Sequence, residues 1–286
     1  MSFLGRIKGT ANELIDSISN ALKVSLHDGS GNAIGSNNSS LNVLDYYTRV
    51  AQGLVPGSKI IQKYGKNPSV SSGTYSTIWN GGGAYTGFPT GAETVTVTSS
   101  SIDDVATTGT GLWTLRIYGL SATGLEQSED IIMNGTTAVT STLSYLRLNR
   151  AKGLTAGALL HNDGDITIRQ SITTTTIFAV MPATYNTTMI AAYTVPSDKN
   201  GYLLSQRASI ANKNAATVAM RIKSRSPGVL FTVGGEAALN STGTGYININ
   251  FKIPSKIPPL TDIFIEAEAS TNVAVTAFFD ILLVDI

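Results

Sequence analysis

Short runs in which apolar and polar residues alternate dominate the sequence from about residue 58 onward. The clearest run is Glu93 to Ser99, where valine and threonine alternate, and similar runs cover 113–118, 144–148 and 165–169. Successive side chains of a strand point to opposite faces, so a period of two is typical of half-buried strands. Turn-forming clusters separate the runs, which predicts antiparallel strands, and Asn134-Gly135 predicts a hairpin.

A second series of strand patterns follows the first. These segments are 177–182, 189–195, 201–210, 216–222, 245–253, 262–269 and 273–284. Pro254, Pro258 and Pro259 would break a central strand, so they predict an edge or a corner. We therefore expect an all-β chain with two antiparallel β-sandwich (jelly-roll-like) units. The expected division is an N-terminal arm and linker over 1–40, a first sandwich over 41–176 and a second over 177–286.

The first 22 residues have a different period. Apolar side chains recur at steps of three and four, which is the spacing of one helix face. A polar stretch rich in Gly, Ser and Asn follows up to Ser40, and a second short helical pattern covers 41–54. The first helix either docks on another subunit or covers the core of its own chain. We expect a docking arm, with these candidate contacts: Ile7, Ala11, Leu14, Ile15, Ile18 and Leu22.

The last strand segment is unusually apolar, which predicts burial on both faces. Because an exposed apolar strand promotes aggregation, one face is expected to lie against another copy of the chain. A homotrimer is the expected assembly. The candidate interface residues are Phe278, Phe279, Leu282 and Val284.

The composition argues against several classes of partner. Only 14% of residues are charged and the net charge is +1, so a phosphate-binding surface is not expected. Arg221, Lys223 and Arg225 are interpreted as a solvated strand face. There is no cysteine, no apolar run long enough to span a membrane and no recognisable signal peptide. We expect no nucleic-acid or membrane partner, and assembly in a cytoplasm.

No pattern predicts catalysis, a metal or a cofactor. His27 and His161 lack companions at ligand spacing, and 162–165 reads as a turn because it lacks the spacing and closing Glu of a calcium loop. Gly81 to Gly83 lack the Lys of a phosphate loop; they are expected to pack under Trp79, which with Trp113 is a predicted core residue. The paired carboxylates are interpreted as exposed strand residues: Asp103-Asp104, Glu129-Asp130 and Glu266 with Glu268.

Seven short motifs stand out between residues 41 and 170. They are LNVLDY (41–46), AQGLVPGS (51–58), YGKNP (64–68), IWNGGG (78–83), NGTTAV (134–139), YLRLN (145–149) and GDITIR (164–169). These stretches resemble a widespread group of tailed-bacteriophage virion structural proteins. These motifs are turns and strand edges, so the resemblance implies a shared fold and setting and no catalytic residues. Residues 1–40 and 180–286 resemble the group less clearly.

The resemblance and the patterns together predict a non-enzymatic structural protein of a phage particle. We expect a head decoration (cement) or fibre-like protein that is located in the virion, assembled in the host cytoplasm, and bound to the major capsid protein or another virion protein. The alternatives are a neck, tail or baseplate protein and a module that binds host-surface polysaccharide. A polysaccharide-cleaving enzyme ranks last. Sugar binding is favoured only by loop aromatics that could equally pack inside the protein, namely Tyr75, Tyr85, Phe88 and Tyr185.

Overall fold

Four antiparallel sheets and one short helix make up the part of the chain that the structure describes. The structure is a computed structural model, and it describes residues 45–211, 216–241 and 244–286. The predicted arm and its linker lie outside this part. Within the second predicted helical segment, α2 (Tyr46–Ala51) is helical, and its N-cap Asp45 accepts hydrogen bonds from the Tyr47 and Thr48 amides. Residues Gly53–Ile286 form one compact unit.

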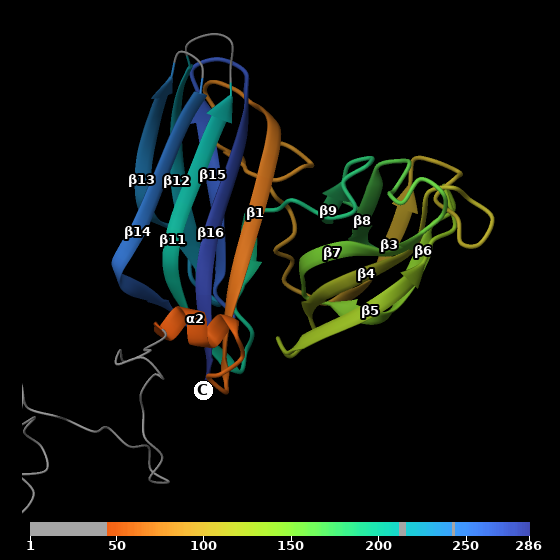
Figure 1. The fold of residues 1–286 in the computed structure, drawn as a ribbon, viewed down its shortest axis with the longest axis horizontal. Helices are drawn as coiled ribbons and strands as arrows, with labels where there is room; N and C mark the ends of the chain where they lie inside the picture. The colour runs from red at the N-terminus through yellow and green to blue at the C-terminus, as the bar shows by residue number, and fades with distance from the viewer. Residues whose placement is uncertain (1–44, 212–215, 242–243) are drawn as a thin grey trace, which may run out of the picture. The chain divides into compact units, whose positions relative to one another are not determined.

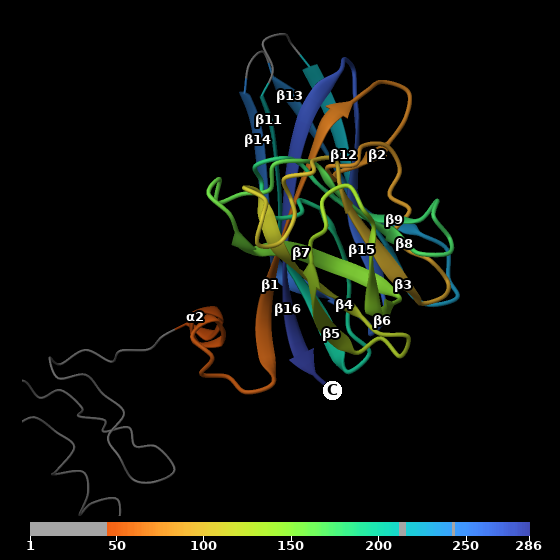
Figure 2. The same cartoon turned by 90° about the vertical axis from the view of Figure 1, so that its right-hand side faces the viewer.

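The longest strands form one sandwich, called here the long-strand sandwich. Its strand β1 runs beside β16, although the two strands come from opposite ends of the unit's sequence (Figures 1 and 2). One sheet has the order β1 (Ser58–Val70), β16 (Val273–Asp285), β11 (Lys199–Ala211) and β14 (Thr244–Ile257). The facing sheet has the order β10 (Ala192–Thr194), β15 (Asp262–Ala269), β12 (Ala216–Arg225) and β13 (Thr232–Ser241), and β2 (Ser76–Thr77) also pairs with β15.

The shorter strands form the second sandwich, called here the short-strand sandwich (Figure 1). One sheet has the order β6 (Val139–Tyr145), β3 (Glu93–Ser99), β8 (Ile166–Gln170) and β9 (Ile177–Met181). The other has the order β5 (Glu126–Ile132), β4 (Leu112–Leu120) and β7 (Arg147–Ala156). In β3 the alternation works as predicted, because Val95 and Val97 are buried while the threonines between them are partly exposed.

Strand β15 contributes to both hydrophobic cores. Its Ile263 and Ile265 lie in the core of the long-strand sandwich, whereas Phe264 between them lies in the core of the short-strand sandwich. Neighbouring residues repeat the arrangement, since Ile78 belongs to the first core and Trp79 to the second. The sheet that contains β15 therefore lies between the two cores, and we call it the middle sheet.

The prediction of an all-β chain built from antiparallel sandwiches is confirmed. Three strand pairings cross the expected division at 176/177, however. β1 and β2 pair with C-terminal strands, and β9 pairs with β8. Pairing between distant segments depends on shape across the whole core, which local alternation does not record. The division into 41–176 and 177–286 as folding units stays a prediction.

Two local predictions are corrected by the structure. Asn134-Gly135 does form a turn, with Gly135 at φ +59°, but the strands it connects, β5 and β6, belong to different sheets and make no hairpin. The apolar run in β16 has its hydrogen-bonding neighbours β1 and β11 in the same chain. Its side chains alternate between buried and partly exposed from Val273 to Ile281, so the predicted burial on both faces is not observed along that stretch.

Candidate functional site

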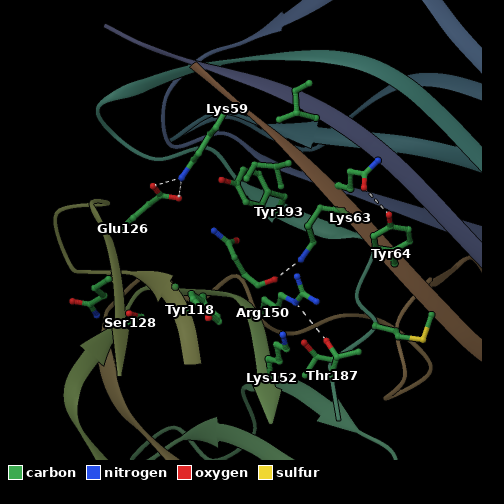
Figure 3. A pocket seen from close by; sticks show the side chains of 18 residues that line it. Lys59, Lys63, Tyr64, Tyr118, Glu126, Ser128, Arg150, Lys152, Thr187 and Tyr193 are labelled. Carbon is green, nitrogen blue, oxygen red and sulfur yellow. Dashed lines mark hydrogen bonds and ion pairs between the residues drawn. The ribbon is translucent and has the colours of Figure 1, made fainter. Parts of the chain in front are cut away.

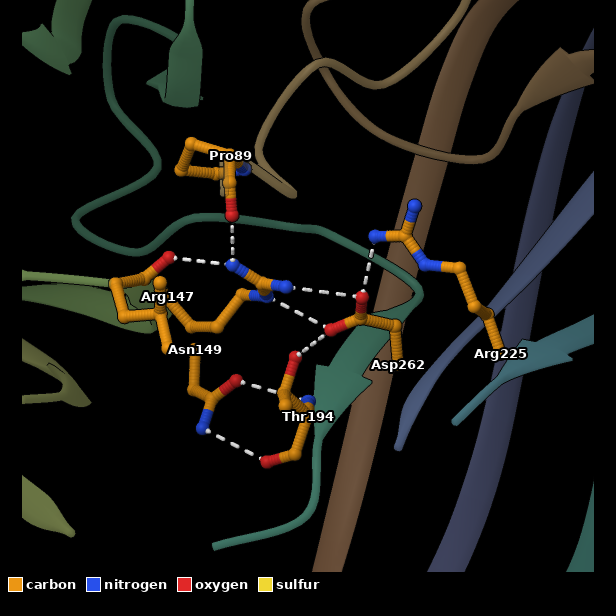
Figure 4. Close-up of polar contacts among 7 residues, drawn as sticks. Pro89, Arg147, Asn149, Thr194, Arg225 and Asp262 are labelled. Atoms are coloured by element: carbon orange, nitrogen blue, oxygen red, sulfur yellow. Dashed lines mark hydrogen bonds and ion pairs between the residues drawn. The ribbon is translucent and has the colours of Figure 1, made fainter. Parts of the chain in front are cut away.

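A buried cluster of charged side chains, called here the Asp262 cluster, joins the two sandwiches (Figure 4). Arg147, at the start of β7, donates from Nε to Asp262 Oδ1 at 2.7 Å and from Nη2 to Oδ2 at 3.0 Å. Arg225 of β12 donates to the same carboxylate at 2.7 Å, and the Thr194 hydroxyl donates to it at 2.6 Å. The Asp262 side chain is only 3% exposed. Bidentate, charge-assisted bonds of this kind fix orientation as well as distance.

Arg147 and Arg225 also make contacts beyond Asp262. Arg147 Nη1 donates to the carbonyls of Pro89 and Leu146 at 2.6 and 2.8 Å. The guanidinium of Arg225 lies 4.2 Å from the centre of the Phe231 ring, within cation–π range. The Asp262 carboxylate is buried and bonded on both oxygens, so it is engaged within the protein. Its chemistry is that of a structural joint.

A groove of about 840 Å³ lies between β1 and the sheet β5-β4-β7 (Figure 3). This volume is within the usual range of ligand sites. Four basic side chains line it, Lys59 and Lys63 from β1 and Arg150 and Lys152 from β7, against the single acidic side chain of Glu126. Lys59 and Glu126 form an exposed ion pair at 2.7 Å. We name this feature the basic groove.

Lys63 is the buried cation of the basic groove. Its ammonium donates to the backbone carbonyl of Asn149 on β7, and no carboxylate of the described residues lies within ion-pair distance. Burial is the main reason why the pKa of Lys63 is lowered to about 7, and the nearby positive charge of Arg150 adds to the effect. Figure 3 shows Lys63 and Arg150 reaching toward each other from the two sides.

Tyr193 also lines the basic groove, and its hydroxyl is buried. The side chain is 3% exposed, and its phenol oxygen is buried without a hydrogen-bond partner. Burial raises the pKa of this phenol far above its ordinary value. Buried polar atoms are nearly always hydrogen-bonded, so an orphaned hydroxyl in a groove marks a position that a ligand or water can complete.

The turn at 162–165 is organised by a buried carboxylate. Asp104 accepts hydrogen bonds from the Leu112 and Asp163 amides through Oδ1, at 2.7 and 2.8 Å. Its Oδ2 accepts from the Ser99 hydroxyl at 2.5 Å and the Gly164 amide at 2.9 Å. The predicted turn is therefore confirmed as a turn, and Asp104, interpreted from sequence as exposed, is instead fully buried. It is buried because it supplies the acceptors that these amides need.

The other carboxylate pairs hold strands and loops in place. Glu266 is 7% exposed and ion-pairs with Arg221, which corrects the interpretation of both as solvated. Asp130 forms a bidentate pair with Arg116, and Glu129 accepts from the Thr142 and Leu143 amides. No group of three or more potential metal ligands occurs in the described ranges.

The aromatic residues singled out from sequence are partly buried and contact neighbouring side chains. Tyr85 contacts Trp79 and Phe88 edge-on, and its hydroxyl donates to the Phe178 carbonyl at 2.9 Å. Tyr75 lies under Arg221, and Tyr185 accepts from Lys66. The predicted packing under Trp79 is confirmed, because a Cβ on Gly81 would come within 2.2 Å of the indole. Trp79 is buried, whereas Trp113 is only half-buried.

The predicted interface residues divide into two kinds. Phe279 and Leu282 are buried within their own chain, so they are core residues. Phe278 and Val284 keep partly exposed side chains, and Phe278 contacts Tyr64 edge-on. The arm residues Ile7 to Leu22 lie outside the described part, as does His27.

Sequence reasoning missed the basic groove completely. Its charged residues come from β1, β5 and β7, and its orphaned hydroxyl comes from β10. The one local signal was Lys63 itself, a charged residue on the inward-facing side of β1, in phase with the buried positions 65 and 67. A charged residue at an inward-facing position of a strand is a useful marker of a functional or joining site.

Comparisons with known proteins give little beyond this geometry. No protein-family model and no curated protein matches the chain. Among solved structures, an infectious bursal disease virus VP2 subviral particle is similar at 10% identity and a TM-score of 0.21, covering 85% of this chain and 78% of the other. The Gx strain of that virus gives 9% identity and 0.22, covering 79% and 75%. These scores do not establish a shared fold. No helix in the described ranges is long and apolar enough to cross a bilayer.

Proposed function

We propose that this protein is a structural component of a tailed-phage virion, and specifically a head decoration (cement) or fibre-like protein. The observation that carries the proposal is the resemblance of residues 41–170 to virion structural proteins, on the motifs given above. A decoration protein stabilises a shell because it binds the assembled lattice better than its separated subunits. Neck, tail and baseplate positions are the alternatives within the same particle.

The structure supports this proposal through the positions of the motif residues. Arg147, in the motif YLRLN, forms the Asp262 cluster, and Asn149 in the same motif accepts from Lys63 and from the Thr194 amide. Trp79, in the motif IWNGGG, lies in the core of the short-strand sandwich, and Gly81 of the same motif packs against its indole ring. These motif residues thus help to set the geometry of a two-sandwich body, and a lattice component needs a fixed geometry.

We further propose that the protein has no catalytic activity. The support is the use of its carboxylates, because Asp104, Glu129, Asp130 and Glu266 all serve hydrogen bonds or ion pairs within the protein. A glycosidase needs two carboxyl groups free to face a substrate. Host polysaccharide incubated with the protein should therefore release no reducing ends.

The proposed partners are other copies of this chain, as a homotrimer, and the major capsid protein or another virion protein. Support for self-association comes from β14, which has a hydrogen-bonded neighbour on one side only in the described sheets. Ile253 and Tyr246 on this strand are 86% and 62% exposed. Exposed apolar residues on a long edge strand are usual where a second chain pairs.

Add-back to defective particles tests the proposed function. Particles of the encoding phage are made without this gene, mixed with the purified full chain and separated on a density gradient. We expect saturable co-sedimentation in copy numbers that are multiples of three, and no further uptake by wild-type particles as the control. Particles that assemble normally without the gene and bind none of the protein would exclude a virion role. A labelled particle map then places it on the head, neck, tail or baseplate.

A further inference from the structure

The basic groove carries more positive charge than its own residues neutralise. Within the described residues, the only ion pair in the groove is Lys59 with Glu126. Arg150 is exposed and its Nε donates to the Thr187 hydroxyl at 3.4 Å, and Lys152 is exposed as well. Three cations therefore face this space without a carboxylate partner, counting Lys63.

Two buried polar groups lack the partners that a bound molecule would supply. Lys63 is 7% exposed and uses one of its three ammonium donors on the Asn149 carbonyl. Tyr193 is 3% exposed and its hydroxyl has no partner. Both line the groove. A buried cation without a counter-ion and an orphaned hydroxyl in one cavity are costly for folding, and such groups are typical of binding sites.

The rest of the lining fits a hydroxyl-rich ligand. Ser128 carries both a donor and acceptors, and Gln62 and Gln127 keep further ones beside their bonds to the Tyr64 hydroxyl and the Ser144 carbonyl. Such groups suit sugar hydroxyls, because each of these donates and accepts. The rings of Tyr64 and Tyr118 are exposed on the groove at 42% and 37%, and aromatic faces pack against the apolar faces of sugar rings. A small inorganic anion would contact only the cations and would make no use of the polar side chains and tyrosine rings.

We propose that the basic groove binds an acidic saccharide, a hydroxyl-rich ring that carries a carboxylate. Arg150 and Lys152 would bind the carboxylate, Lys63 and Tyr193 would complete the buried contacts, and Tyr64 and Tyr118 would pack against the ring. This activity goes beyond the assembly role and does not depend on it. It also differs from the loop site expected from Tyr75, Tyr85, Phe88 and Tyr185, whose rings pack internally or against charged side chains.

Binding should strengthen as the pH falls through 7. The titratable and charged groups that line the groove with Lys63 come from five strands: Arg150 and Lys152 from β7, Glu126 from β5, Tyr118 from β4, Tyr193 from β10, and Lys59 and Tyr64 from β1. Burial and Arg150 lower the pKa of Lys63 to about 7. A carboxylate ligand stabilises the charged ammonium, so binding and protonation of Lys63 favour each other.

Calorimetric titration of the full chain tests the proposal with three probes. Tetragalacturonate carries both the carboxylates and the ring hydroxyls, maltotetraose carries only the hydroxyls, and inorganic phosphate carries only charge. We expect saturable binding of tetragalacturonate, much weaker binding of the other two, and release by salt. Arg150→Gln and Lys152→Gln should each weaken binding about tenfold, because each removes a charge-assisted hydrogen bond. Tyr193→Phe should weaken it through the lost hydroxyl alone.

Lys252→Gln is the matched control, since Lys252 is exposed on β14 at the opposite edge of the sheet that contains β1. It should leave binding unchanged. Arg150 and Lys152 are exposed, so their substitution does not threaten folding, and unchanged melting temperatures verify this. The proposal fails if tetragalacturonate does not saturate at millimolar concentration, if phosphate or maltotetraose binds as well as tetragalacturonate, or if the groove variants bind as the wild type does. None of these outcomes bears on co-sedimentation with particles.

Discussion

Asp262 is the residue on which the joint between the two sandwiches depends most. It is the shared acceptor for two arginines and a threonine. Asp262→Asn keeps the shape and removes the charge, which leaves two guanidinium groups without their counter-ion. Breaking a buried ion pair from one side costs about 3–5 kcal/mol. Urea unfolding should show a loss of this size.

Asp130→Asn is the matched control for this substitution. Asp130 also forms a bidentate pair with an arginine, but both side chains are about two-fifths exposed. Exposed pairs contribute little because water and salt screen them. A similar, small effect of both substitutions would show that the Asp262 cluster does not hold the sandwiches together.

Lys63 should give the stability a distinctive dependence on pH. Its pKa falls from an ordinary 10.5 to about 7 in the folded chain, so between these values the unfolded chain binds more protons. Stability should therefore rise as the pH rises from 7 to 10.5, by at most about 1.4 kcal/mol per pH unit from this group. Below pH 7 both states are charged and the contribution is constant.

Lys63→Met isolates this contribution in the measured stabilities. The variant lacks the titrating group, so its advantage over the wild type should be largest near pH 6.5 and shrink toward pH 10. Urea unfolding of both proteins at several pH values gives the difference directly. Parallel stability curves for the two proteins would mean that Lys63 is not a destabilised, buried cation.

At the scale of elements, alternation predicted strands well and their partners poorly. The predicted segment 262–269 has the same bounds as β15. β13 was missed, since Gly234 and Gly235 interrupt its pattern. The pairing of β1 with β16 joins residues more than 200 apart, and no local period encodes that contact. The Asp262 cluster and the basic groove could not be predicted from sequence for the same reason, because their residues come from distant segments.

The exposed edge of β14 is the proposed surface for self-association. If copies of the chain meet there, Ile253→Lys should prevent it, because a charge on an edge strand opposes pairing. Light scattering should give a mass near three times 30.0 kDa for the wild type and 30.0 kDa for the variant. Lys252→Gln, which changes an exposed neighbour, should keep the larger mass. A wild-type monomer would rule out the trimer, and a trimeric variant would place the interface elsewhere.

At the scale of the whole molecule, the chain combines a folded body with the predicted docking arm. Residues 53–286 form a compact unit with two cores that share the middle sheet. The arm prediction rests on the apolar stripe from Ile7 to Leu22 and the polar linker after it. About five buried side chains at roughly 1.5 kcal/mol each would supply the gross docking energy, before the costs of association.

The most direct test introduces negative charges into the apolar stripe of the full chain. It measures both the folding of the protein and its attachment to particles. Leu14→Asp with Ile18→Asp should leave the melting temperature nearly unchanged and abolish co-sedimentation with particles that lack the protein. Asn12→Asp with Ser19→Asp, on the polar side of the predicted helix, is the control and should still attach. A double variant that melts much lower would place the segment in the protein's own core, and one that attaches as the wild type does would contradict docking through the arm.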